Sequence, residues 1–196
     1  MKEQEIIPEN VRGIQTNTEA NAVLPDEGAA KEFYQVVKNR LLHINQWREV
    51  AGKASAEFTL TDKNGVSVDR WAQAGDHIRI DIPGPGTITG EGDDWVHIEE
   101  ILDENEMLVI TVRPASNPRN DRKDVAHFFS DEATSNFIIK REGTKVFAAV
   151  YGRNERPNTN TEKLVDKIRN AAVATGAISG FAKLQWKALV EGLVRI

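Results

Sequence analysis

The sequence contains no cysteine, so disulfide bonds, thiolate metal ligands and a cysteine nucleophile are all excluded. It has no apolar run near the roughly 20 residues of a membrane-spanning helix, and its N-terminus lacks the apolar core of a secretory signal. We therefore expect a soluble, cytoplasmic protein without a membrane span. The chain also lacks an excess of positive charge, since its formal net charge is -5. This charge argues against nucleic acid or an anionic membrane surface as a partner.

Motifs that identify a cofactor or a metal site are missing as well. The loop from Pro83 to Asp94 is rich in glycine and proline, but it lacks the Lys-Ser or Lys-Thr that ends a phosphate-binding loop. Its acidic residues do not have the spacing of a calcium-binding EF-hand. No two histidines have the i, i+4 spacing of a zinc-binding helix. We therefore expect no metal and no cofactor, and we interpret the loop as a surface turn.

The length of 196 residues and the hydrophobic content of 40% suit one well-packed domain. Residues 1–25 are polar, contain two prolines and follow neither a helical nor a strand period. We interpret them as an arm that lies extended over the body or is partly disordered. Residues 26–196 are assigned to a single domain.

Helical periodicity is present near both ends of that domain. Asp26 is suited to cap a helix that continues to Gly52, and Thr159 with Glu162 has the spacing of a capping box that opens a second helix. A third helix is expected from Ile178 to about Val194. The inward stripe of the first helix comprises Phe33, Val37, Leu41, Ile44, Trp47 and Ala51.

Alternation of apolar and polar residues predicts the strands. Residues 77–113 are typical of an antiparallel meander, and its first strand places Ile78 and Ile80 on one face. Residues 56–61 and a short strand from Val66 flank Asn64-Gly65, the preferred pair for a two-residue hairpin turn. Residues 136–151 predict another hairpin with two apolar faces, so we expect cover on both sides of it.

Together these elements predict an α+β fold. A curved antiparallel sheet of about seven strands packs against one long N-terminal helix and two C-terminal helices. The order of a helix, a run of strands and a terminal helix resembles the helix-grip layout of lipid-transfer and cyclase-like proteins over roughly residues 27–194. The resemblance is one of layout, and we find no clear strand before the first helix.

The meander also predicts a register. Setting Ile80 opposite Val96 and Ile78 opposite Ile98 makes the apolar face continuous, whereas a shift of one residue would reverse every side chain. Across the next turn, Ile98 is expected opposite Val112.

This register gathers polar side chains on the other face of the sheet. It sets Arg79 opposite His97, His77 opposite Glu99 and His97 opposite Arg113, so we expect Glu99 to raise the pKa of His77. A histidine beside a carboxylate suits general acid–base chemistry, and arginines suit an anionic ligand. The other interpretation is an ordinary solvated sheet face. The catalytic candidates are His77, His97 and Glu99, and the ligand-binding candidates are Arg79, Arg113, Trp95, Tyr151 and Trp186.

Three classes of function remain open. The first, which we favour, is a protein that binds a small, largely apolar ligand between the sheet and the C-terminal helix. The second is an enzyme that uses the His and Glu pair on the polar face. The third is a protein interaction module that contacts its partner through the loop from Pro83 to Asp94, through the arm or through the loop at Arg153. Further aromatic candidates for the lining of a pocket are Trp71, Phe128 and Phe129.

Overall fold

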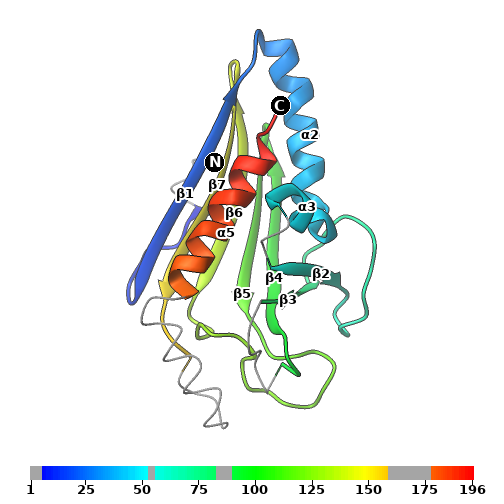
Figure 1. Cartoon of the computed structure of the whole chain (residues 1–196), viewed down its shortest axis with the longest axis vertical. Coiled ribbons are helices and arrows are strands. Elements are labelled where there is room, and N and C mark those ends of the chain that lie inside the picture. The colour runs from blue at the N-terminus through cyan, green and yellow to red at the C-terminus, as the bar shows by residue number, and fades with distance from the viewer. Residues whose placement is uncertain (1–5, 53–55, 83–89, 159–177) are drawn as a thin grey trace.

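Seven strands form one open antiparallel sheet with helices packed on it, which confirms the predicted fold class (Figure 1). The computed structural model describes residues 6–52, 56–82, 90–158 and 178–196, with side chains from residue 183 onward in the last range. The strand order is β1-β7-β6-β5-β4-β3-β2. The strands are β1 Ile14–Val23, β2 Glu57–Thr61, β3 His77–Asp81, β4 Asp94–Glu104, β5 Met107–Pro114, β6 Thr134–Glu142 and β7 Lys145–Glu155.

The N-terminal helical region is divided where we predicted one continuous helix. Asp26 accepts a hydrogen bond from the backbone N–H of Ala29 at 2.8 Å and so caps the first helix as expected. His43 then leaves the helical conformation, and the chain continues as a short 3-10 turn and a second short helix. The break places Asn45 where its side chain accepts from Leu60 N at 2.7 Å and donates to Val68 O at 2.8 Å. The elements are α2 Glu27–Leu42, η1 Ile44–Gln46 and α3 Trp47–Ala51.

The C-terminal helix is confirmed as α5, Ile178–Leu193. The helix predicted to begin near Thr159 lies outside the described residues. Among the helices that the structure describes, none has the length and apolar character needed to cross a membrane.

A ten-residue strand, β1, lies within the segment that we interpreted as an arm, and it pairs antiparallel with β7. We missed it because its inward side chains are small or hydroxylated and contrast little with the polar residues between them. This strand supplies the element that we did not find ahead of the first helix. Its inward residues are Thr16, Thr18, Ala20 and Ala22.

Four residues ahead of β1 are attached to Asn154, near the end of β7. Asn154 adopts a left-handed conformation with φ 55, which asparagine tolerates better than most residues. Its Oδ1 accepts from Val11 N at 2.8 Å and Arg12 N at 3.1 Å. Its own N–H donates to Asn10 Oδ1 at 2.8 Å, and its Nδ2 donates to Glu9 O at 3.2 Å. These bonds hold the segment before β1 on the body of the protein.

The sheet is strongly curved, as the contacts of one indole demonstrate. The Trp47 ring lies 5.3 Å from the ring of Phe58 on β2 and 4.8 Å from that of Phe137 on β6. These two strands are four places apart in the sheet, which in a flat sheet would separate them by about 19 Å. One side chain reaches both because the sheet curls around the helices.

The two faces of the sheet differ in what covers them. The concave face carries the main core against α2, α3 and α5 (Figure 1). The reverse face of the β6–β7 hairpin is apolar too, as predicted from its double alternation. Ile6 and Ile7 of the N-terminal segment pack on it. The reverse-face cluster consists of Val109, Ile138, Ala149 and Tyr151.

The predicted register between β3 and β4 is wrong by two residues. Ile78 lies opposite Val96, and His77 lies opposite His97. A shift of two residues leaves every side chain on the same face, so the alternation cannot distinguish the two registers. Between β4 and β5 the pairs Ile98–Val112 and His97–Arg113 are confirmed, but an extra residue at Glu99 interrupts the pairing.

Residues 60–68 turn back antiparallel as predicted, with Asp62 N donating to Val66 O at 2.9 Å and Val68 N to Leu60 O at 3.0 Å, but the turn is not the predicted two-residue one. The side chain of Asp62 accepts from the backbone N–H groups of Asn64 and Val66, both at 2.9 Å. Gly65 has a φ of 77, but Asn64 does not share the positive φ that a type I′ turn requires. Within residues 56–82, the expected strand from Val66 is reduced to an isolated bridge between Thr61 and Ser67.

Candidate functional site

An enclosed cavity lies inside the curve of the sheet, beneath α3 and α5. Its volume is about 30 Å³, and its walls come from strands β2 to β6 and from the two helices. The lining residues are Trp47, Phe58, Ile78, Ile80, Val96, Val112, Ser135, Phe137 and Trp186.

Four aromatic rings close one side of this cavity. The ring of Trp186, on α5, lies 6.0 Å from that of Phe58 and 5.2 Å from that of Phe137. The indole of Trp47 contacts the same two rings, and its Nε1 donates to Leu41 O at 3.0 Å. Its polar atom is therefore satisfied outside the cavity, so the ring presents only carbon to the interior.

Two of the nine lining residues are half-exposed, whereas the other seven are buried. Ser135 near the start of β6 and Trp186 on α5 are these two. They mark the side on which the cavity lies closest to solvent. Ser135 also supplies the one hydroxyl group among the lining side chains.

The cavity is far smaller than a typical ligand pocket, which measures roughly 300 to 1,000 Å³. A volume of about 30 Å³ is enough for one or two water-sized probes but not for an organic ligand. The aromatic rings occupy the space between the sheet and the C-terminal helix. A ligand can enter only if one of them moves.

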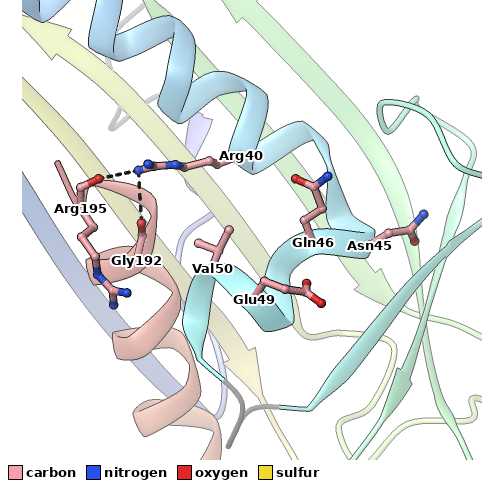
Figure 2. A pocket seen from close by; sticks show the side chains of 7 residues that line it. All are labelled: Arg40, Asn45, Gln46, Glu49, Val50, Gly192 and Arg195. Atoms are coloured by element: carbon pink, nitrogen blue, oxygen red, sulfur yellow. Dashed lines mark hydrogen bonds between the residues drawn. The ribbon is translucent and has the colours of Figure 1, made fainter.

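A larger hollow of about 580 Å³ lies open to solvent where α2, α3 and the end of α5 meet (Figure 2). Figure 2 shows Arg40 reaching from α2 to the end of α5. Its Nη1 donates to Leu193 O at 2.8 Å and to Arg195 O at 2.7 Å, and so caps the C-terminal end of α5. Gly192 allows the close contact between helices, because a Cβ there would lie 1.9 Å from Val50 O. We therefore interpret this hollow as part of the packing contact between the helices and not as a ligand site.

The structure brings the two candidate histidines together on the reverse face of the sheet. Their ring centroids lie 5.0 Å apart, and Nδ1 of His77 is buried without a hydrogen-bond partner among the described residues. Burial lowers the pKa of His77, and the neighbouring His97 lowers it further. The expected increase in this pKa is therefore wrong.

Glu99 does not join the histidines as we expected. Its Oε1 accepts from Arg113 Nε at 2.8 Å, and Arg113 Nη1 also donates to the carbonyl oxygen of Asp131 at 2.9 Å. The two-residue shift between β3 and β4 places His97 opposite His77, so Glu99 does not face that histidine. The carboxylate neutralises an arginine, and so neither of the two is free to act on a ligand by itself.

Arg79 and Trp95 lie opposite each other in the next row of the reverse face. Arg79 Nη2 donates to Thr59 Oγ1 at 3.3 Å, and its Nε lies 3.8 Å from Asp93 Oδ2. Trp95 is fully buried, with its Nε1 donating to Gly90 O at 3.3 Å and the guanidinium of Arg119 5.3 Å from its ring. Trp95 is packed under a loop rather than lining an open cleft.

The two remaining candidates lie on opposite faces of the sheet. Trp186 lines the cavity, whereas the hydroxyl of Tyr151 donates to Glu19 Oε1 at 2.7 Å on the reverse face. Among the further aromatic candidates, Trp71 is half-exposed, and Phe128 and Phe129 stack near His127 away from the cavity. One of our ligand-binding candidates therefore borders the cavity.

Most lining residues were missed as site residues, although several were assigned to the core. Trp47 and Phe137 belong to predicted apolar faces, but no local pattern indicates that five strands and two helices converge on one point. Within the described ranges, no three His, Asp or Glu side chains are grouped closely enough to hold a metal ion.

No protein-family model and no curated protein matches the chain. A solved structure of a hypothetical protein from Helicobacter pylori is similar to it, with a TM-score of 0.59 and 13% identity over 99% of this chain and 93% of that chain. The two chains share a fold. At this identity the similarity carries no information about activity.

Two further solved structures are similar at TM-scores below 0.5, too low to support an argument. One is a STAR-related lipid transfer protein from Xanthomonas axonopodis, with a TM-score of 0.49 and 13% identity over 90% of this chain and 85% of that chain. The other is a major latex-like protein from Panax ginseng, with a TM-score of 0.41 and 11% identity over 86% and 97% of the two chains.

Proposed function

We propose that the protein binds a small, largely apolar molecule between the sheet and α5. The observation that carries this proposal is the enclosed cavity at that interface, whose walls are apolar apart from Ser135 on its half-exposed side. Such walls favour a ligand with an apolar body and a single polar end. The polar end would lie next to the Ser135 hydroxyl.

The indole of Trp186 is the wall that would move to admit the ligand. It is half-exposed while the other three rings of the cluster are buried, so turning it outward removes the least apolar surface from the core. The vacated space would add the volume of an indole to the cavity. A ligand of about that size could then contact Phe58 and Phe137 in place of the indole.

Calorimetric titration with straight-chain alcohols from hexanol to dodecanol tests this proposal. We expect saturable binding to the wild type, tighter binding to Trp186→Ala because its wall no longer has to move, and weaker binding to Val112→Phe because the cavity is filled. Leu184→Ala is the matched control, since Leu184 is on the same helix but exposed. The proposal is overturned if neither the wild type nor Trp186→Ala binds any alcohol, or if Leu184→Ala changes binding as much as Trp186→Ala does.

A second candidate function rests on the histidine pair. His77 is half-buried, its Nδ1 has no hydrogen-bond partner among the described residues, and burial lowers its pKa, which favours the neutral imidazole. A neutral imidazole can accept a proton, as general base catalysis requires. Glu99 would not take part, because it is bound to Arg113. A proton-transfer role predicts that a small-molecule substrate shifts the ring signals of His77 in an NMR titration. If the His77 signals do not shift with any ligand that binds the protein, the proton-transfer role is ruled out.

A further inference from the structure

The strand β1 forms one edge of the sheet, and no other described strand pairs with its outer side (Figure 1). Natural proteins usually protect such edges with lysine, proline or a bulge. Between Ile14 and Val23 there is no lysine, arginine or proline, and Glu19 is the one charged residue. The irregularity in the pairing is confined to the start of the strand, between Ile14 and Thr16. The remaining eight residues are an unprotected edge.

One hydrogen bond shows which backbone groups face outward. Leu24 N donates to Thr144 O at 2.8 Å, so Leu24 points toward the β7 side. Successive residues in an antiparallel strand alternate in direction, and the register is constant from Thr16 onward. The N–H and C=O groups that point away from the sheet therefore belong to Asn17, Glu19, Asn21 and Val23.

Side chains that could cover this edge are held toward the body instead. Glu19 accepts from the hydroxyl of Tyr151 at 2.7 Å, and Asn17 Oδ1 accepts from Arg153 Nη1 at 2.8 Å. Thr16 donates to Glu155 Oε1 at 3.1 Å. In the described part of the chain, no other strand or side chain is bonded to the outward backbone groups of this edge, which leaves them available to another strand.

We infer that the β1 edge pairs with the β1 edge of a second copy of this chain, antiparallel about a two-fold axis. Two identical edges are self-complementary about such an axis and need no charge of opposite sign, which suits an edge with one charged residue. The pairing joins the two sheets into one continuous sheet.

The register of this pairing follows from charge and overlap. An axis at Glu19 would set the two Glu19 carboxylates directly opposite each other, which is unfavourable. An axis at Thr18 places Glu19 opposite Asn17 of the second copy and overlaps nearly the whole strand. It also sets Thr16 opposite Ala20 of the second copy. Ile14 and Val23, which are 54% and 59% exposed at the two ends of the strand, are brought near each other across the pair.

Sedimentation equilibrium over a range of protein concentrations tests the association. We expect the wild type to double in mass as its concentration rises, and Asn21→Pro to remain monomeric. Proline at this position removes an outward N–H without removing a bond to β7, so circular dichroism should show an unchanged fold. Leu184→Lys is the control, because it removes exposed apolar surface from α5 and should still dimerise. A monomeric wild type, or a dimer that survives Asn21→Pro, overturns the inference.

Disulfide trapping tests the register, and the lack of native cysteine makes single-cysteine variants specific. Thr18 would form a non-hydrogen-bonded pair with itself across the axis, where Cα atoms lie about 4.5 Å apart, within the range of a disulfide. We expect oxidised Thr18→Cys to form covalent dimers. Ala20→Cys is the matched control, since its two copies would be four residues out of register. Efficient trapping through Ala20→Cys instead of Thr18→Cys contradicts the proposed pairing.

Discussion

The carboxyl group of Glu155 gives the protein a stability that depends on pH near neutrality. Glu155 is 8% exposed, and its Oε1 accepts a hydrogen bond from Thr16 across the β1–β7 pair. The side chain curls back over Gly152, where an added Cβ would lie 2.0 Å from Oε1. Burial raises the pKa of Glu155 from 4.5 to about 7, although the Thr16 hydroxyl and the nearby Arg153 favour the charged form.

The raised pKa determines the sign and size of the effect. Below pH 4.5 the carboxyl is protonated in both states, and between pH 4.5 and about 7 the folded state alone holds the proton. The unfolded chain then binds fewer protons, so stability falls as pH rises through this window. Because one pKa unit corresponds to about 1.4 kcal/mol, a pKa of about 7 implies a loss of about 3 kcal/mol between pH 4.5 and pH 7.

Urea unfolding of the wild type and of Glu155→Gln at pH values from about 5 to 8 measures this effect. Glutamine has nearly the same shape and stays neutral, so the difference between the two proteins isolates Glu155 from other titrating groups. We expect Glu155→Gln to be more stable than the wild type by about 3 kcal/mol at pH 8, with the difference shrinking toward pH 5. A difference that does not change with pH would refute the buried position of this carboxyl.

Three further predictions follow from the core, the helix cap and the histidine pair. Leu41→Ala should lower the free energy of unfolding by about 2 to 5 kcal/mol in urea, because Leu41 is fully buried. A loss of less than about 1 kcal/mol, half of the lower limit, would contradict this prediction and would mean that neighbouring side chains fill the space left by Leu41. Asp26→Ala should cost about 1 kcal/mol in the same assay through the lost cap of α2, and an unchanged midpoint would contradict it. In an NMR titration His77 should titrate below 6.5, and His97→Asn should reverse only part of that decrease, because burial is the larger cause. Full reversal would show that the partner ring dominates.

The parts of the fold that were predictable are those with large contrasts between apolar and polar residues. Val37 and Leu41 on α2, and Ile78 and Ile98 in the meander, are buried as their periodicity indicates. The strand β1 has no such contrast, because its inward side chains are threonines and alanines. The predicted total of about seven strands is right, but β1 takes the place of the expected strand from Val66.

The candidate site was less predictable because it depends on long-range geometry. A period of two cannot distinguish registers that differ by two residues, so His77 was placed opposite Glu99 instead of His97. The extra residue at Glu99, which turns this carboxylate toward Arg113, has no local signature. The cavity arises from curvature of the sheet around Trp47, and no single segment encodes that curvature.

Methyl NMR during titration with decanol tests the central claim that a ligand binds inside the curve of the sheet. Isoleucine and valine methyl groups report on both faces at once, since some line the cavity and others belong to the reverse-face cluster. The account predicts saturable shifts for Ile78, Ile80, Val96 and Val112, and unchanged signals for Val109 and Ile138. Shifts confined to Val109 and Ile138, or no saturable shift in any of the six, would contradict it.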